Sequence, residues 1–155
     1  MPEKSTVAKA KEDLREGKSP STAAGEFVHE EIDHVREGKH GARSPQQAIA
    51  IGLSKARRAG IPLKPPRRGR TSEGTRKRAA RDYQRGRTSS DRRPSRRRSR
   101  ATEGALKREP RSSASRSALS RQTRGASQRR GHANRSRAAR RAAATRAHRR
   151  HRARR

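Results

Sequence analysis

Large apolar side chains are concentrated in one part of this chain. Nine of its thirteen Ile, Leu, Val and Phe residues fall between positions 27 and 63, whereas the 92 residues that follow contain only two. A segment poor in such residues cannot bury enough apolar surface to offset the conformational entropy lost on folding. Residues 27–63 are therefore the only part that we expect to fold on hydrophobic grounds.

Helical periodicity predicts two helices before residue 40. Residues 5–16 carry apolar side chains at helical spacing, and Gly17 provides a left-handed end. Pro20 and the serines around it are expected to interrupt the chain. Residues 26–37 then form an amphipathic helix that ends at Gly38. The helix of residues 5–16 is mostly polar, so we expect it to be only marginally stable.

A third helix begins with a clear capping sequence. Ser44 is suited to the N-cap, Pro45 to the first helical position, and Gln47 completes a capping box. The predicted helix covers residues 45–59 and ends at Gly60. Its first half is apolar nearly all round, so it needs more than one neighbour.

The preceding helix supplies one neighbour through a seven-residue loop, residues 38–44. The second neighbour is either the extended segment 61–63 or another copy of the chain, so one expectation is a homodimer through residues 26–63. Two helices joined by a loop in residues 26–59 also suggest a helix-turn-helix, but this loop is longer than the usual three or four residues. Base-specific readout is therefore not expected.

Charge divides the chain at nearly the same place as hydrophobicity. Residues 1–63, here called the head, carry eleven Lys or Arg against nine Asp or Glu. Residues 64–155, here called the tail, carry thirty-four against five, and no acidic residue follows Glu109. Because nothing within the tail neutralises this charge, the tail is expected to repel itself and to seek a polyanion.

The tail has the composition of a helix former without the pattern of a packed helix. Alanine and arginine favour helices, which makes segments 73–85, 102–108, 112–130 and 133–154 possible helices. None has an apolar stripe, and like charges on neighbouring turns oppose helix formation. We therefore predict a mostly α fold, with a small hairpin module of two or three helices followed by a largely disordered or nascent-helical arginine-rich tail. The expected divisions are a marginal helix in residues 1–20, the hairpin in residues 21–63 and the tail in residues 64–155.

Arginine dominates the tail, with thirty-one Arg against three Lys. The guanidinium group is planar, stays charged and grips phosphate oxygens with two parallel hydrogen bonds. The predicted function is non-sequence-specific binding and compaction of double-stranded DNA. The predicted phosphate contacts are Lys64, Arg67, Arg68, Arg70, Arg92, Arg93, Arg96, Arg97, Arg98, Arg100, Arg129, Arg130, Arg140, Arg141, Arg149 and Arg150, with additional head contacts from Lys55, Arg57 and Arg58.

The scarcity of aromatic residues favours duplex binding over single-strand binding. Phe27 is expected in the core, which leaves Tyr83 as the only stacking platform. Modules that bind single strands usually interleave several aromatic and basic residues. Duplex DNA is therefore favoured over RNA. A basic protein associated with RNA or the ribosome, and a protein-interaction adaptor with a polyanion-localising tail, are the alternatives.

Other chemistry lacks support in the sequence. There is no cysteine for disulfides or thiol chemistry. His29 and His34 are five residues apart, about 140° around a helix, so they do not face one metal together. Gly17, Lys18 and Ser19 resemble the end of a phosphate-binding loop, but position 12 is Glu where that loop has Gly. We expect no enzyme activity, cofactor, metal or small-molecule substrate.

Residues 30–60, EEIDHVREGKHGARSPQQAIAIGLSKARRAG, closely resemble a short proteobacterial domain of unknown function. Members of that family show a similar glycine–lysine loop, QAIAI helix and basic RAG ending, and many continue into a basic tail. The tail is also similar to those of bacterial histone-like proteins, although these usually favour lysine. The resemblance implies a bacterial setting and carries no catalytic or binding residues. With no apolar leader and no membrane span in the sequence, we expect a soluble, unprocessed protein in the cytoplasm, at the nucleoid.

Overall fold

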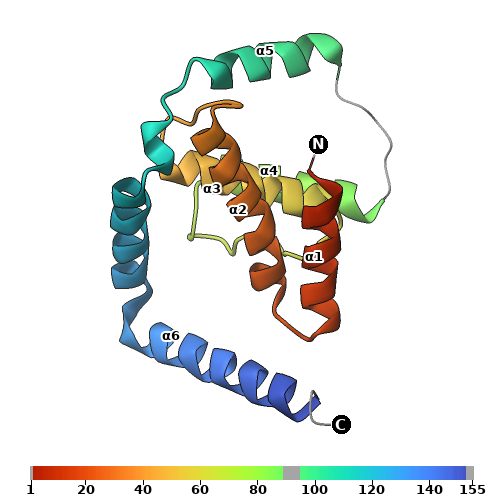
Figure 1. The fold of residues 1–155 in the computed structure, drawn as a ribbon, viewed down its shortest axis with the longest axis vertical. Helices are drawn as coiled ribbons and strands as arrows, with labels where there is room; N and C mark the ends of the chain where they lie inside the picture. The colour runs from red at the N-terminus through yellow and green to blue at the C-terminus, as the bar shows by residue number, and fades with distance from the viewer. Residues whose placement is uncertain (1, 89–94, 153–155) are drawn as a thin grey trace.

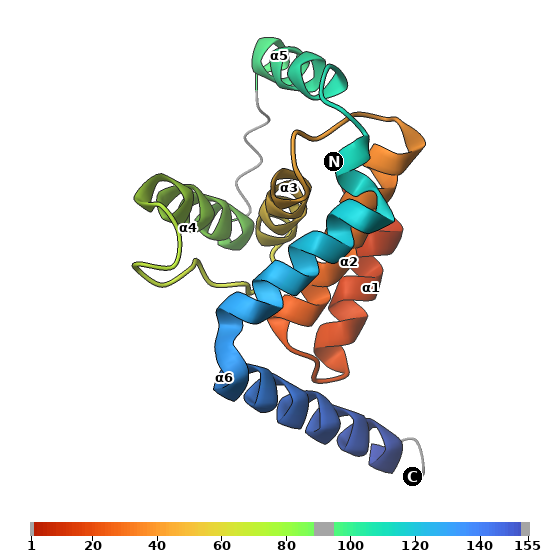
Figure 2. The same cartoon turned by 90° about the vertical axis from the view of Figure 1, so that its left-hand side faces the viewer.

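The computed structural model of the protein describes residues 2–88 and 95–152, and these residues form an all-helical fold (Figure 1). The elements in chain order are α1 (Lys4–Arg15), α2 (Pro20–Glu37), α3 (Pro45–Arg58), α4 (Glu73–Arg87), α5 (Arg96–Lys107), the 3₁₀ helix η1 (Ser112–Ala114) and α6 (Arg116–Arg152). Helix α2 packs against both α1 and α3, α4 lies against α3, and the first part of α6 lies near α3 (Figures 1 and 2).

The ends of the head helices follow the local sequence closely. Ser44 Oγ accepts a hydrogen bond from the Gln47 N–H at 3.2 Å, which caps α3 as predicted. Gly38 ends α2 in the left-handed conformation, with φ 80°. Helix α2 begins at Pro20, six residues before the predicted start, because Ser19 caps it and Pro20 occupies its first turn. Proline here starts a helix instead of interrupting the chain.

Alanine makes up much of the core between α1, α2 and α3. Phe27 and Ile61 are the large buried side chains, and four fully buried alanines surround them. Helix α1 therefore belongs to the core and supplies a neighbour that the sequence prediction treated as marginal. The buried residues of this cluster are Ala10, Ala23, Ala24, Phe27, Ala56 and Ile61, with Val7, Leu14, Leu53, Ala59 and Leu63 packed against them.

A second apolar cluster joins the head to the tail. It contains Val35, Ala42 and Ala48 from the head and Ala114 from η1. The backbone supports this contact, because the Gly41 N–H donates to the Leu106 carbonyl at 2.9 Å and the Ala42 N–H donates to the Pro110 carbonyl at 3.1 Å. Close approach at Gly41 requires glycine, since a Cβ there would overlap the Glu109 carbonyl. Residues 106–114 are thus fixed to the loop between α2 and α3.

The prediction of a largely disordered tail is wrong. Helices α4, α5 and α6 cover most of the described tail, and residues 116–152 are helical apart from a break at Gly131. Serines that separate the basic stretches are N-caps: Ser72 accepts from the Thr75 N–H, Ser95 from the Arg98 N–H and Ser115 from the Ala118 N–H. Caps at these positions supply the start signals that offset like-charge repulsion along each helix.

Small residues also let tail helices approach the head. Helix α4 packs on α3 at Gly86, where a Cβ would overlap the Arg57 carbonyl. On the same contact, Ser54 Oγ donates to Asp82 Oδ2 at 2.6 Å, and Ala79 is buried. A tail helix therefore needs no stripe of large apolar residues to be held against the head.

Helix α6 consists of two straight limbs. Gly131 has φ 68° and ψ 161°, which is not helical, and the chain changes direction there (Figures 1 and 2). We call residues 116–130 the N-terminal limb and residues 132–152 the C-terminal limb. The N-terminal limb lies near the start of α3, and Gln46 Nε2 donates to Gln122 Oε1 at 2.6 Å.

Two glycines provide a matched test of the α2–α3 packing. A Cβ at Gly52 would lie 2.7 Å from Val28 Cα and 2.8 Å from the Phe27 carbonyl oxygen, whereas a Cβ at Gly25 would meet no atom within 4 Å. We expect Gly52→Ala to lower the free energy of unfolding by about 1–3 kcal/mol through overpacking. Gly25→Ala should raise it by about 0.5–1 kcal/mol through helix propensity. Urea denaturation of both variants checks this, and equal shifts would contradict the close approach.

Candidate nucleic-acid interface

Helix α5 presents four arginines in its first half. Arg96, Arg97, Arg98 and Arg100 are all exposed, and no acidic residue lies in the first turn. The N-terminal end of a helix carries partial positive charge from its free N–H groups, so cations placed there are unfavourable until an anion approaches. Among the described elements, α5 packs against none. Its arginines are therefore free to meet an external phosphate.

Helix α6 carries the largest share of the positive charge. It holds thirteen arginines and no acidic residue. Every arginine of this helix whose side chain is described is exposed, including Arg129, Arg130, Arg140, Arg141 and Arg150 of the predicted set. Arg149 belongs to the same helix.

The segment between α3 and α4 holds the remaining predicted positions of the tail. Lys64, Arg67, Arg68 and Arg70 are all exposed on this non-helical connection, in which Gly69 has φ 76°. Their charges project from a turn at the edge of the head. Arg92 and Arg93 lie outside the described residues.

The three basic residues predicted as head contacts have partners within the protein. Lys55 Nζ lies 2.7 Å from Glu31 Oε2 and 3.4 Å from Glu30 Oε1. Arg57 is buried and donates from Nε to the Leu63 carbonyl at 3.1 Å, and burial lowers the pKa of its guanidinium from the ordinary value. Only Arg58 is exposed, and its Nε donates to the Ser54 carbonyl at 3.3 Å. The positive surface therefore lies on the tail.

Aromatic side chains give no stacking platform. Phe27 is fully buried in the head. Tyr83 is half-buried on α4, and the guanidinium carbon of Arg87 lies 5.7 Å from the centre of its ring. These are the only Phe and Tyr of the chain, and it has no Trp. Binding through this surface has to rest on charge and hydrogen bonding to phosphate.

The two histidines of α2 lie close to carboxylates of the same helix. His29 Nδ1 lies 2.9 Å from Asp33 Oδ2, one turn further along the exposed side of the helix. His34 is half-buried, with Nε2 4.0 Å from Glu30 Oε1. Burial raises the pKa of Glu30, but hydrogen bonds from the Thr6 side chain and the Glu3 N–H, together with the charge of Lys55, outweigh burial and hold that pKa below its ordinary value.

One buried group of side chains was missed by the sequence analysis. Glu31 is fully buried, and His40 from the loop before α3 reaches its carboxylate. His29 and His34, the two histidines that the sequence places near each other, diverge on the helix. The pair at i and i+3, Glu31 and His34, was the available signal, because these positions share one face of a helix.

Comparison of the chain with protein-family models, with curated proteins and with solved structures gives no match. None of the helices in residues 2–88 and 95–152 is long and apolar enough to cross a membrane. The geometry of the chain itself is therefore the basis for a functional proposal.

Lys55 and Arg58 form a matched pair for testing which basic residues of α3 are needed internally. Lys55→Met would leave two buried carboxylates without their ammonium partner, and we expect a loss on the order of 3 kcal/mol in the free energy of unfolding. Arg58→Met, at an exposed position, should change it by less than about 0.5 kcal/mol. Thermal and urea unfolding measure both, and similar losses would show that Lys55 has no special internal role.

Proposed function

We propose that the protein binds double-stranded DNA without sequence specificity, through phosphate contacts from the arginines of α5, α6 and residues 64–70. The observation that carries the proposal is α6, a helix with thirteen arginines and no acidic residue whose described arginine side chains are all exposed. Such a helix has no internal counter-charge. A polymer of closely spaced phosphates supplies one.

The dimensions of α6 support binding to a duplex. A helix with its side chains is about 10–12 Å wide, and the major groove of B-DNA is about 12 Å wide. The C-terminal limb, residues 132–152, is about 31 Å long at ~1.5 Å per residue, close to one turn of duplex. Its arginines are distributed around the helix, so a limb lying in the groove reaches the phosphates on both walls. The major groove of RNA is deep and narrow and does not admit a helix in this way.

The polar residues of α6 support binding without sequence readout. Base edges are read mainly by Asn and Gln, whose amides pair a donor with an acceptor, and by Arg, whose guanidinium offers two parallel donors. Asn134 donates to the Arg130 carbonyl and accepts from Arg137, and Gln122 accepts from Gln46. Two of the three amide side chains of α6 thus already have partners, and the third, Gln128, is exposed. The arginines are spread over every side of the helix. Contacts to phosphate position a protein on DNA and do not select a sequence.

The positions of α5 and the C-terminal limb support compaction. In Figure 1 these two arginine-rich helices lie at opposite ends of the molecule, with the head between them. One molecule can therefore contact two duplexes at once. Bridging of this kind, at the bacterial nucleoid, is the cellular role that we propose.

Neutralising one limb tests the phosphate contacts. We replace Arg135, Arg137, Arg140, Arg141, Arg146 and Arg150 with Gln, a good helix former. Log affinity falls with log salt, and each lost contact should make this negative slope shallower by ~0.9. Loss of all six contacts should therefore reduce the magnitude of the slope by about 5. The matched control replaces the same six residues with Lys, which keeps the charge and should keep most of the slope. Affinity for a duplex of arbitrary sequence is measured by fluorescence anisotropy over a range of salt.

An unchanged slope in the Gln variant would refute contacts by this limb. Tighter binding of structured RNA than of a duplex with the same number of phosphates, at matched salt, would instead favour the RNA-associated alternative. Circular dichroism of each variant establishes that the helix content is retained.

Bridging gives a separate prediction for α5. Replacing Arg96, Arg97, Arg98 and Arg100 with Gln should leave one binding surface on α6 and remove the second. We expect the variant to bind a single duplex with an affinity reduced by less than about 10-fold in low salt, but to lose co-precipitation of an unlabelled duplex with an immobilised one. Bridging that persists at the wild-type level would show that α5 does not supply the second contact.

A further inference from the structure

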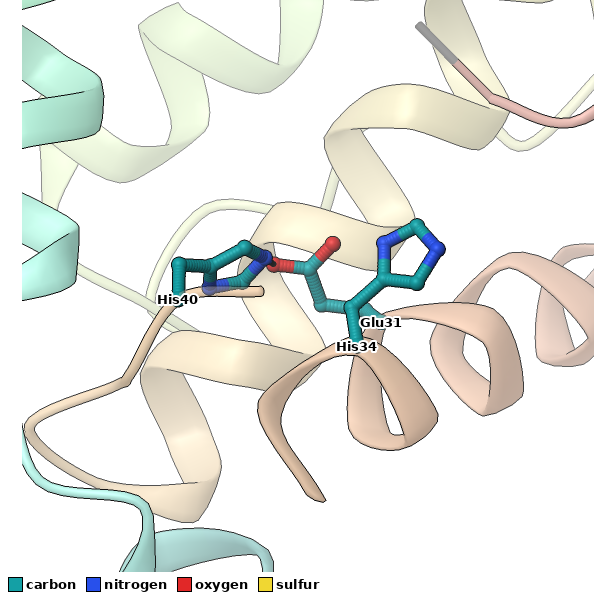
Figure 3. Close-up of side chains that lie close together, drawn as sticks. All are labelled: Glu31, His34 and His40. Atoms are coloured by element: carbon teal, nitrogen blue, oxygen red, sulfur yellow. Dashed lines mark ion pairs between the residues drawn. The ribbon is translucent and has the colours of Figure 1, made fainter. Parts of the chain in front are cut away.

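A compact group of polar side chains lies where the end of α2 meets the loop before α3 (Figure 3). Glu31 is fully buried, His34 follows it by one turn of α2, and His40 comes from the loop. One nitrogen from each histidine and one oxygen of Glu31 lie within 4.8 Å of one another. In Figure 3 the carboxylate of Glu31 lies between the two imidazole rings.

A hydrogen bond fixes which nitrogen of His40 carries a proton. Nδ1 lies 3.0 Å from the Gly41 carbonyl oxygen, and a carbonyl can only accept, so Nδ1 is the donor. In the neutral ring Nε2 then carries a lone pair. This nitrogen lies 3.3 Å from Glu31 Oε1. A lone pair and a buried carboxylate oxygen at that distance repel each other unless a positive charge lies between them.

His34 has a similar arrangement. Its Nε2 lies 3.3 Å from Glu3 Oε1, and since a carboxylate accepts, Nε2 is the donor and Nδ1 carries the lone pair of the neutral ring. Each histidine thus has one nitrogen held by an oxygen outside the cluster. Histidines that bind metals are typically oriented by such an outer acceptor, which fixes the tautomer and raises the basicity of the free nitrogen.

The balance of buried charge around the cluster also favours a bound cation. Glu30 and Glu31 are both buried and share one ammonium group, that of Lys55. Lys55 lies on the Oε2 side of Glu31, and Oε1, on the other side, accepts no hydrogen bond from the described residues. With both histidines neutral, two carboxylates and one ammonium leave one negative charge uncompensated, in a chain whose net charge is +31.

One ligand separation already matches a tetrahedral metal site, and the three ligand atoms lie within 4.8 Å of one another. Two ligands bound to zinc at ~2.0–2.1 Å are about 3.3 Å apart when the geometry is tetrahedral. The separation of His40 Nε2 and Glu31 Oε1 is 3.3 Å. His34 also borders the groove between α1 and α2, which has a volume of about 270 Å³ and is lined by several carboxylates together with Lys9 and Lys39.

We propose that Glu31, His34 and His40 bind a divalent transition-metal ion through Oε1, Nδ1 and Nε2, and that the ion is zinc. Two imidazoles and one carboxylate are a ligand set that zinc accepts, with water as the fourth ligand. The ion holds the loop against α2. Because Gly41 and Ala42 of this loop hydrogen-bond to Leu106 and Pro110, the metal also stabilises the attachment of the tail to the head.

Titration of the full-length protein, freed of metal by a chelator and of nucleic acid by high salt, tests the proposal. Isothermal calorimetry with Zn²⁺ should show one ion per chain with a dissociation constant below about 10 μM. His40→Gln should weaken binding by at least about 100-fold, since loss of an outer acceptor alone costs ~10–100-fold. His29→Gln, on the exposed side of α2, and the pair His148→Gln and His151→Gln, in α6, should leave the affinity unchanged.

Imidazole ¹⁵N NMR on the wild-type chain provides a readout that no substitution can disturb. Addition of Zn²⁺ should shift His34 Nδ1 and His40 Nε2 in the same titration. Three results would overturn the proposal: no binding in the micromolar range, binding that survives combined replacement of His34 and His40 with Gln, or a metal-insensitive spectrum in which His40 is protonated on both nitrogens at neutral pH. In the last case a proton supplies the counter-charge to Glu31.

Discussion

Repulsion among guanidinium groups is the constraint on which this structure depends. The tail has thirty-four basic residues and only five acidic ones, so it cannot neutralise itself by folding into a compact body. The chain instead distributes the charge over separate helices that expose their arginines. Contacts with the head are made by small residues and backbone groups, as at Gly41, Gly86 and Ala114. The positive charge is thereby ordered and remains accessible to an external anion.

The head and the tail use charge in opposite ways. In the head, Lys55 and Arg57 are enclosed and paired with carboxylates or carbonyl groups, and they stabilise the packing of α3 on its neighbours. In the tail, α6 contains no acidic residue, and the one acidic residue of α5, Glu103, pairs with Lys107. The proposed DNA binding follows from the tail, and the proposed metal site follows from the excess of buried carboxylate in the head. The loop of residues 38–44 connects the two, since it carries His40 and receives the backbone of residues 106–114.

Local signals in the sequence were sufficient to predict where the head helices end. Most of the features that the sequence did not predict depend on contacts between residues far apart in the chain. Ser44 and Gly38 act through neighbouring residues, so their capping roles could be predicted. The core was underestimated because only large side chains were counted, whereas Ala10 and Ala23 are as buried as Phe27. The N-cap roles of Ser72, Ser95 and Ser115 were not predicted, because an N-cap is recognised only when the helix that follows it is predicted too. The exposure of the tail arginines could be predicted from composition. The pairing of Lys55 with buried carboxylates and the approach of His40 to Glu31 could not, because both depend on how α2, its loop and α3 pack.

Photo-crosslinking of the full-length protein to a duplex of arbitrary sequence, followed by mapping of the attached peptides, tests the central claim most directly. The claim is that ordered arginine helices of the tail, and not the head, meet the phosphates. The account predicts crosslinks in residues 64–70 and along α5 and α6, with few or none in α1 to α3. Crosslinks concentrated in α1 to α3, or none in low salt, would contradict it.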